Sequence, residues 1–282
     1  MIHRLLVGAA LALAALGARD ALACRTTTCA ASNAPPECAR DPFTECWVVG
    51  APLAWPEACV SFAVEARGVP ALGLDYSATE ALVTQAFATW PNTSCPDGFP
   101  SISVTSFGPL ACTELEYQPS GPNSNAVLFR ESNWEHEPSA IGLTTVTFDT
   151  TIGRIMDADI EINLSGFQLS VDDLRYVLTH EAGHFFGLDH SADAQALMYT
   201  HYDFVDQLGP PVLTADDVAA ICSAYPLSRA MTACDFEPPR GFSAECGGDV
   251  EGGCSVTPAG HSKTPWLLAA FLGCLLAVRR RV

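Results

Sequence analysis

The sequence predicts a layered fold in which helices pack against a β-sheet, of the α/β or α+β class. Two observations lead to this prediction. Short runs of apolar or alternating residues, typical of strands, lie on both sides of an amphipathic helical segment, and a second helical segment follows them. Hydrophobic residues make up 49% of the 282 residues, which is enough for a packed core.

The first predicted elements are a strand and a helix. Residues 60–65 alternate between apolar and polar side chains and predict the strand. Residues 76–90 predict the helix, with Ser77 as a candidate N-cap and Glu80 three residues later. Pro91 ends it, because the residue before a proline disfavours the helical conformation. The apolar side chains near one face are Leu82, Val83, Ala86, Phe87 and Trp90.

Four more strands are predicted before the second helix. They cover residues 102–107, 125–129, 141–148 and 155–163. The middle of the chain shows no internal repeat and no low-complexity tract. This organisation favours one sizeable domain flanked by tails.

The chain begins with a pattern typical of export, so residues 1–23 are predicted to be a signal peptide. Arg4 supplies a positive charge, and the apolar run of residues 5–16 is too short to span a bilayer. Residues 21–23 (Ala-Leu-Ala) offer a cleavage site that would leave Cys24 first. Lipid attachment to Cys24 is the alternative, because a cysteine follows the site.

Ten of the 12 cysteines lie before the Gly-rich stretch that precedes the C-terminal apolar run. An even number in an exported chain predicts disulfides, although their pairing cannot be deduced from the sequence. Residues 24–55 are rich in Cys and predict a disulfide-linked N-terminal segment. The ten are Cys24, Cys29, Cys38, Cys46, Cys59, Cys95, Cys112, Cys222, Cys234 and Cys246.

The C-terminal end carries a second targeting pattern. Residues 229–265 form a Gly/Pro-rich, Cys-containing linker, and residues 266–282 form an apolar run closed by three arginines. The run is short for a permanent membrane span, and a buried core helix is the alternative. The arrangement resembles the sorting tails of myxobacterial surface proteins. That resemblance implies a bacterial protein delivered to the cell surface or released, with membrane association through the tail.

The most informative segment is residues 170–190, SVDDLRYVLTHEAGHFFGLDH. Ser170 can cap a helix with acidic residues in its first turn. His180 and His184 lie four residues apart, so both imidazoles project from one helical face and can reach one zinc ion. Glu181 lies beside them but out of line, where it can contact a water at the metal rather than the metal itself.

The chain then turns back toward this helix. Gly187 can adopt the left-handed conformation that ends a helix, which lets His190 return as a third ligand. Three protein ligands leave a fourth position open, as catalytic zinc sites do. The alternative is that these are ordinary core or surface histidines, because a bare H-E-x-x-H occurs by chance in many chains. Five fixed positions falling together favour zinc binding.

The segment HEAGHFFGLDH resembles the zinc signature of the metzincin peptidases. Met198, eight residues past His190, sits where that clan places its Met-turn beneath the zinc. The tetrapeptide ALMY (residues 196–199) and Ser191 are most similar to the matrixins, the family of the matrix metalloproteinases and their bacterial relatives. The likeness extends over residues 56–228.

The resemblance implies an α+β catalytic domain with a mixed, twisted five-stranded sheet, three main helices and zinc in a cleft between two lobes. Residues 213–226 correspond to its closing helix. Residues 141–148 correspond to the strand that binds an extended substrate, so Leu143 and Thr144 are expected in the substrate pocket. Tyr202 matches the wall tyrosine of that pocket.

Three carboxylates, Asp157, Asp159 and Glu161, alternate along one predicted strand and therefore share one face. Calcium favours such oxygen ligands and is a candidate second cofactor, although a solvated strand face explains the pattern equally well. Vertebrate matrixins bind a structural zinc through histidines in this region. Because this stretch has no histidine, a second zinc is not expected.

Three other residues are not expected to bind the metal. His136 is expected to be structural or exposed rather than a ligand. Tyr199 is adjacent to the methionine, whereas the tyrosine ligand of astacins stands two residues after it. Thr200 replaces a proline that matrixins frequently carry.

The sequence therefore predicts a secreted or surface-associated zinc endopeptidase, a monomer acting on proteins or peptides with Glu181 as general base. Its net charge of −18 would be repelled by phosphate backbones, so nucleic-acid binding is not expected. One alternative is a surface binding or adhesion module that keeps zinc for structure. A second is a peptidase of another metzincin family, with Tyr199 or Tyr202 bound to zinc.

Overall fold

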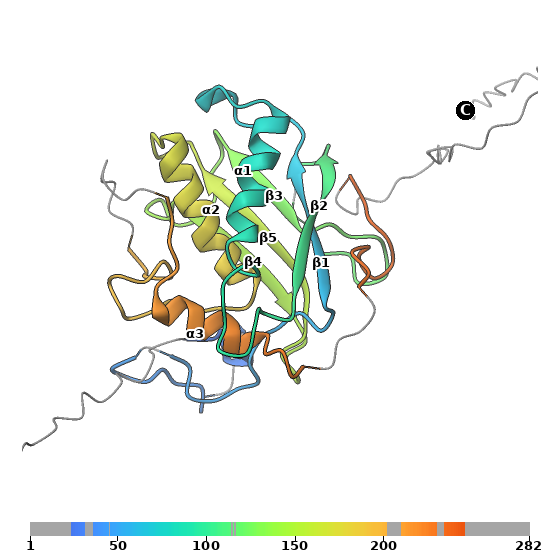
Figure 1. The fold of residues 1–282 in the computed structure, drawn as a ribbon. Coiled ribbons are helices and arrows are strands. Elements are labelled where there is room, and N and C mark those ends of the chain that lie inside the picture. Colours follow the sequence, from blue (N-terminus) through green and yellow to red (C-terminus); the bar gives the residue numbers. More distant parts are fainter. Residues whose placement is uncertain are drawn as a thin grey trace, which may run out of the picture. The chain divides into compact units, whose positions relative to one another are not determined.

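The computed structural model describes residues 24–31, 36–44, 46–113, 115, 117–201, 210–229 and 234–245. Figure 1 shows the five strands and three α-helices into which they fold. The strands are β1 (Cys59–Glu65), β2 (Ser103–Leu110), β3 (Ala126–Arg130), β4 (Gly142–Phe148) and β5 (Ile155–Asn163). The helices are α1 (Tyr76–Ala88), α2 (Val171–Phe185) and α3 (Ala215–Ala224), with short 3-10 turns at Thr28–Ala30 and Pro70–Leu72.

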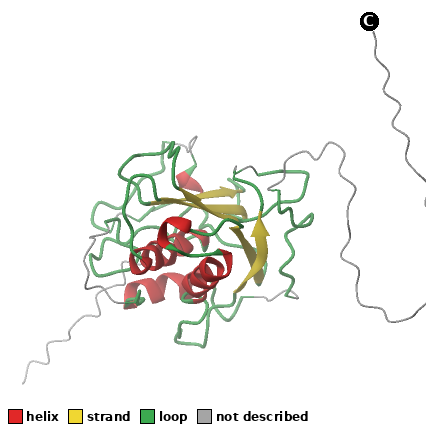
Figure 2. Cartoon of the chain, turned by 90° about the horizontal axis from the view of Figure 1, so that it is seen from above, coloured by secondary structure: helices red, strands yellow, loops and turns green. Residues whose placement is uncertain are grey.

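The strands form one mixed sheet in the order β2-β1-β3-β5-β4. Neighbouring strands run parallel except β4, which is antiparallel to β5. Helix α1 packs on β1 and β2, and α2 packs on β4 and β5. Seen from above, the α-helices lie together on one side of the sheet (Figure 2). The predicted α+β fold, with a mixed five-stranded sheet and three helices, is therefore confirmed.

Aromatic side chains fill the space between the sheet and the helices. Phe62 of β1 stacks on Phe87 of α1 with ring centroids 4.2 Å apart, and Phe87 meets Phe185 of α2 edge-on at 4.9 Å. All three are at most 1% exposed. Trp90 donates its indole N–H to the carbonyl of Thr179 at 2.8 Å, which ties the end of α1 to α2. This buried layer sets the position of α2, the helix that carries His180 and His184.

The start of α1 differs from the prediction. Asp75, rather than Ser77, is the N-cap, and its carboxylate accepts a hydrogen bond from the backbone N–H of Ala78 at 2.8 Å. Asp75 has the extended backbone that a cap requires, whereas Ser77 already lies inside the helix. The carboxylate of Glu80 accepts from the hydroxyl of Ser106 instead of completing a capping box.

Residues 24–55 are predicted to form a disulfide-linked N-terminal segment, and the part of them that the structure describes contains such bonds. Two disulfides close it internally, and two others join segments far apart in the chain. Isolated β-bridges pair Arg25 with Leu188 and Ala54 with Arg154, so the segment is attached to the domain at several points. The described disulfides are Cys24–Cys46, Cys29–Cys38, Cys59–Cys234 and Cys95–Cys222.

Several predictions on the chain ends fall outside this part of the molecule. The expected signal peptide (residues 1–23), the apolar C-terminal run (residues 266–282) and most of the linker (residues 229–265) lie outside the described residues. Within the described residues, no helix has the length and apolar character needed to cross a bilayer.

Removal of the Cys59–Cys234 disulfide is expected to lower the free energy of unfolding more than removal of Cys29–Cys38. The first spans a sequence separation of 175 residues and the second a separation of 9. In the chain-entropy description these loops correspond to about 5 and about 2.7 kcal/mol of stabilisation. Urea unfolding of the two double-serine variants measures both losses. An equal or larger loss for the shorter loop would contradict this expectation.

Candidate metal centre

Two of the three histidines lie on α2, whose start and rotation follow from the sequence. The hydroxyl of Ser170 accepts from the backbone N–H of Asp173, and the carboxylate of Asp173 accepts from the backbone N–H of Ser170. The predicted cap is therefore confirmed and extended to a capping box. Leu174 is fully buried against the sheet. The burial of Leu174 fixes the rotation of α2 about its axis. In this orientation, His180 and His184 lie together near the C-terminal end of the helix.

A tight turn after α2 brings in the third histidine. Gly187 has a φ of +82°, in the left-handed region, as predicted. A Cβ at this position would lie 2.6 Å from the carbonyl oxygen of Leu53, so the space also requires glycine. The turn returns His190 to α2, where its Nε2 lies 3.2 Å from Nε2 of His184.

The three imidazoles face one another. One nitrogen from each of His180, His184 and His190 lies within 4.8 Å of the others, and no other set of three or more potential ligands occurs among the described residues. Nδ1 of His180 bonds to the carbonyl of Leu197 at 2.8 Å, and Nδ1 of His184 to that of Leu188 at 2.9 Å. Because a carbonyl only accepts, both Nδ1 atoms carry the proton and both Nε2 atoms keep a lone pair for a metal.

The spacing and charge of these nitrogens fit a zinc ion. Tetrahedral zinc with Zn–N bonds of about 2.0–2.1 Å holds its ligand nitrogens roughly 3.3–3.4 Å apart. The observed separation of 3.2 Å between His184 and His190 agrees with this. Burial, and then the neighbouring His184, lowers the pKa of His180, and burial with the neighbouring histidines lowers the pKa of His190 to about 2. The neutral imidazole is the form that binds a metal.

The carboxylate of Glu181 lies against the outer strand β4. Its Oε2 accepts a hydrogen bond from Oγ1 of Thr144 at 2.6 Å. A Cβ on Gly142 would lie 2.5 Å from its Oε1, so the glycine makes room for the carboxylate. Thr144, expected in the substrate pocket, is thus a hydrogen-bond donor to Glu181, a contact that sequence reasoning missed. A role of Leu143 in that pocket stays a prediction.

Met198 packs directly against α2, as a Met-turn residue is expected to do. It is 2% exposed, and a Cβ on Gly183 would lie 2.3 Å from its Sδ. Asp217, in the first turn of α3, accepts from the backbone N–H groups of Met198 at 3.0 Å and Leu197 at 2.9 Å. Sequence reasoning missed Asp217. Its only signal is the capping box it forms with Thr214, which does not reveal that it also contacts the backbone of residues 197 and 198.

The predicted calcium ligands Asp157, Asp159 and Glu161 lie on β5 and line a cavity of about 660 Å³. They are only 3%, 5% and 6% exposed, so the alternative of a solvated strand face is wrong. Glu161 pairs with Arg130 at 2.5 Å through one carboxylate oxygen and with His136 at 2.8 Å through the other. His136 thus has the structural role expected. Among the described residues the three carboxylates do not form a three-ligand set, and calcium there stays a prediction.

The structure describes some, but not all, of the residues predicted to lie near Met198. Tyr202, the predicted pocket wall, lies outside the described residues. Tyr199 forms an isolated bridge with Ser191, and its ring lies 5.5 Å from that of His201 between centroids. Ser191 donates its hydroxyl to Asp216 at 2.7 Å, which ties the chain after the third histidine to α3.

Comparison with known proteins agrees with this arrangement. Residues 108–226 match the profile of a family described as Matrixin. A stretch of 53 residues is 45% identical to the macrophage metalloelastase of Oryctolagus cuniculus. This stretch is 19% of the present chain and spans only 11% of the metalloelastase. The first strand and helix of the sheet-and-helix domain, β1 and α1, precede the matched residues.

Three converging histidines with a carboxylate beside them, on a mixed sheet covered by helices, form an arrangement that suits a catalytic zinc ion, because three protein ligands leave a fourth position open. The match over residues 108–226 makes this part of the chain similar to the Matrixin family, and it supports a zinc metalloendopeptidase of that type.

Substitution of Gly183 by Ala is expected to destabilise the protein and to weaken zinc binding. The new Cβ would lie 2.3 Å from Sδ of Met198 and 2.8 Å from Cζ2 of Trp90, both buried. Overpacking of this kind costs roughly 1–3 kcal/mol, which exceeds the gain of about 1 kcal/mol for Gly to Ala in a helix. Thermal unfolding and zinc titration measure the two effects. Gly121→Ala, whose Cβ would meet nothing closer than 3.5 Å, is the control, and equal unfolding midpoints would refute the steric account.

Substitution of Asp157 by Asn is expected to stabilise the protein more at pH 8 than at pH 5. Burial, and then Asp159, raises the pKa of Asp157 above its ordinary value of 3.8. The unfolded chain therefore loses this proton near pH 4 while the folded chain keeps it, so the free energy of unfolding falls as pH rises above that point. Asn cannot titrate and removes this loss.

Urea unfolding of both proteins at the two pH values measures the effect. Asp97→Asn, at an exposed position, should show no such pH dependence. A difference between Asp157→Asn and wild type that is the same at both pH values would count against the buried, protonated state of Asp157.

Proposed function

We propose that this chain is an exported, zinc-dependent endopeptidase that acts as a monomer on extracellular proteins or peptides. The observation that carries the proposal is the convergence of three imidazoles beside a buried glutamate. His180, His184 and His190 each bring one nitrogen within 4.8 Å of the others, and Glu181 is 5% exposed. A purely structural zinc site does not need this carboxylate, which disfavours an adhesion or binding module.

The three histidines would hold the zinc ion, which when bound supplies a Lewis acid that polarises a carbonyl and acidifies water. Glu181 would act as the general base, taking the proton of the attacking water and passing it to the leaving amine. Thr144 donates to Oε2 of this carboxylate at 2.6 Å. The proton is therefore carried at Oε1, and the hydrogen bond keeps the carboxylate oriented during the transfer.

The substrate would bind as an extended strand along β4. This strand is the last in the sheet order and pairs with β5 alone among the described strands. Backbone groups on its other edge are arranged to pair with a peptide by strand addition. Gly142 and Thr144, near the start of β4, both approach the carboxylate of Glu181. A peptide on this edge would thus pass close to the general base, with Leu143 and Tyr202 as candidate pocket residues.

Export is proposed from two features. The described disulfides fit an oxidising compartment outside the cytoplasm. The signal pattern of residues 1–23 and the sorting-tail pattern of residues 266–282 support delivery to a bacterial surface or to the medium. Calcium at the β5 carboxylates would be an additional, non-catalytic ligand.

Replacement of Glu181 by Gln is expected to lower kcat/KM for a denatured protein substrate by at least about 100-fold, because the amide cannot accept the proton. Zinc content should be unchanged, since Glu181 is not among the three nitrogen ligands. The measurement is proteolysis by the purified full-length chain, with and without a zinc chelator, alongside metal analysis.

Glu57→Gln is the matched control, because Glu57 is paired with Arg154 at 3.0 Å, away from the histidines. It should cleave at the wild-type rate. Chelator-sensitive cleavage that persists undiminished in Glu181→Gln would exclude Glu181 as the base. Zinc binding without any cleavage by the wild type would favour the binding-module alternative.

A further inference from the structure

His190 differs from the other two histidines in what holds it in place. His180 and His184 are positioned by α2, whereas His190 lies three residues beyond the Gly187 turn, outside any helix. Its backbone N–H donates to Oδ1 of Asp189 at 2.8 Å. The position of the third histidine therefore depends on how firmly the chain from Gly187 to Asp189 is held.

The N-terminal segment supplies several hydrogen bonds to that short stretch. The backbone N–H of Thr26 donates to the carbonyl of Gly187 at 3.0 Å, and its hydroxyl donates to the carbonyl of Leu188 at 3.0 Å. The carbonyl of Cys24 accepts from the backbone N–H of Asp189 at 3.2 Å. Residues 24–26 thus run beside the turn like an added strand.

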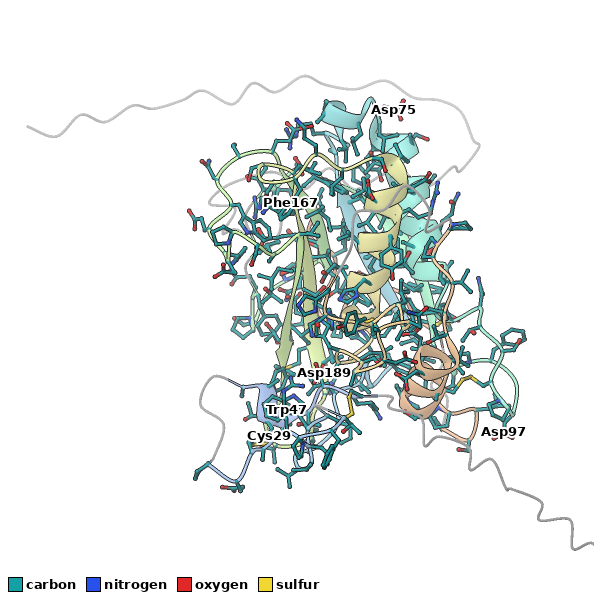
Figure 3. All side chains as sticks on the ribbon, turned by 90° about the vertical axis from the view of Figure 1, so that its left-hand side faces the viewer. Cys29, Trp47, Asp75, Asp97, Phe167 and Asp189 are labelled. Atoms are coloured by element: carbon teal, nitrogen blue, oxygen red, sulfur yellow. A yellow bond between two sulfur atoms is a disulfide. The ribbon has the colours of Figure 1, made fainter. Side chains whose placement is uncertain are left out.

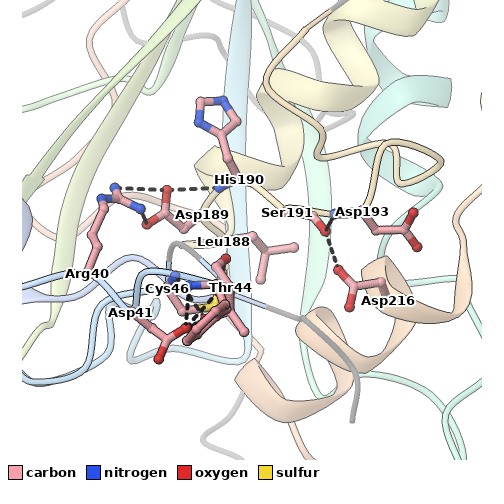
Figure 4. Close-up of a disulfide and its surroundings, with 12 residues drawn as sticks. Arg40, Asp41, Thr44, Cys46, Leu188, Asp189, His190, Ser191, Asp193 and Asp216 are labelled. Atoms are coloured by element: carbon pink, nitrogen blue, oxygen red, sulfur yellow. Dashed lines mark hydrogen bonds and ion pairs between the residues drawn. A yellow bond between two sulfur atoms is a disulfide. The ribbon is translucent and has the colours of Figure 1, made fainter. Parts of the chain in front are cut away.

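The same segment also reaches the side chain of Asp189. Arg40 forms an ion pair with it, Nη1 to Oδ2, at 2.9 Å. Asp189 has a side chain only 8% exposed, while that of Arg40 is 41% exposed. A buried carboxylate needs a charge partner, because removing one member of such a pair leaves an uncompensated charge. Figure 4 shows Arg40 facing Asp189, with His190 directly beyond it.

The two sets of contacts are joined covalently. Arg40 lies in a small hairpin, pairing with Trp47 by a β-bridge and stacking over its ring at 4.3 Å. Cys46, next to Trp47, is bonded to Cys24, the residue that accepts from Asp189. The disulfide therefore connects the backbone contact and the side-chain contact to one aspartate. Figure 3 shows Trp47 and Cys29 of this segment on the same side of the molecule as Asp189.

We propose that Arg40 is a positioning residue for the metal site, and that the disulfide-linked hairpin carrying it braces the third ligand through Asp189. Arg40 keeps the Asp189 carboxylate in the orientation that accepts the backbone N–H of His190. Without Arg40 the carboxylate turns toward solvent to recover its hydration, and the His190 loop loses a hydrogen bond that fixes its geometry. The inference rests on the proposed zinc-dependent function and assigns a metal-site role to a segment far from the motif in sequence.

The test compares Arg40→Gln and Arg40→Lys with wild type in the full-length chain. Zinc affinity is measured by competition with a chromophoric chelator, and the ligand geometry by the visible absorption of the cobalt-loaded protein. Loss of a residue that orients a ligand typically weakens metal binding 10–100-fold, and the half-exposed Arg40 should lie at the lower end, about 10-fold. The cobalt spectrum of Arg40→Gln should differ from that of wild type. The zinc affinity and the cobalt spectrum of Arg40→Lys should lie between those of Arg40→Gln and wild type.

Arg154→Gln is the control, because Arg154 is about as exposed as Arg40, at 46% against 41%, and its ion pair with Glu57 does not involve the His190 turn. It should bind zinc as wild type does. A wild-type zinc affinity and cobalt spectrum in Arg40→Gln would overturn the proposal. If Arg40→Gln does not fold, Arg40→Lys decides, since unchanged affinity and spectrum in it would equally overturn the proposal. Failure of the proposed function is separate, because it would appear as absent zinc binding or absent proteolysis in the wild type.

Discussion

The site depends on the reversal of the chain between Gly187 and His190. A helix can present two histidines one turn apart to the same point, but a third residue on that helix would be displaced along the axis or around it. A third ligand therefore has to come from chain that leaves the helix and returns. Gly187 makes the return with a left-handed backbone, and the carbonyl of Leu53, 2.6 Å from where a Cβ would be, leaves no room for a side chain. The remaining contacts of the turn keep it in this position.

A second chain of contacts, from α3, reaches His180. The carboxylate of Asp217 accepts from the backbone N–H of Leu197, and the carbonyl of Leu197 bonds to Nδ1 of His180. Helix α3 is thereby connected to a metal ligand through a single residue. The same carboxylate accepts from Met198, whose side chain packs where only Gly183 leaves space. The ligand helix is thus supported by elements before and after it in the sequence.

The three buried carboxylates of β5 are stabilised in different ways. The sequence has 32 acidic and 14 basic side chains, so buried carboxylates compete for few cations. Glu161 pairs with the Arg130 guanidinium and hydrogen-bonds to Nε2 of His136, while Asp159 accepts from the backbone N–H of Ala126 at 2.8 Å. Asp157 instead stays protonated, since burial raises its pKa. Arg130, His136 and the backbone of Ala126 thus supply donors to two of the three carboxylates at which calcium is predicted.

Local pattern indicated the five strands and the first two helices, and it singled out the three candidate ligand histidines. The spacing of His180 and His184, the glycine at 187 and the cap at Ser170 act within a few residues, so a sequence reading can find them. The cap of α1 was misplaced because Asp75 and Ser77 are both good capping residues, and the start of the helix decides between them. The contacts of Thr144, Asp217 and Arg40 were not predictable. Each joins residues far apart in the chain, and only packing of β4, α3 and the N-terminal hairpin around α2 brings their polar atoms within hydrogen-bond distance.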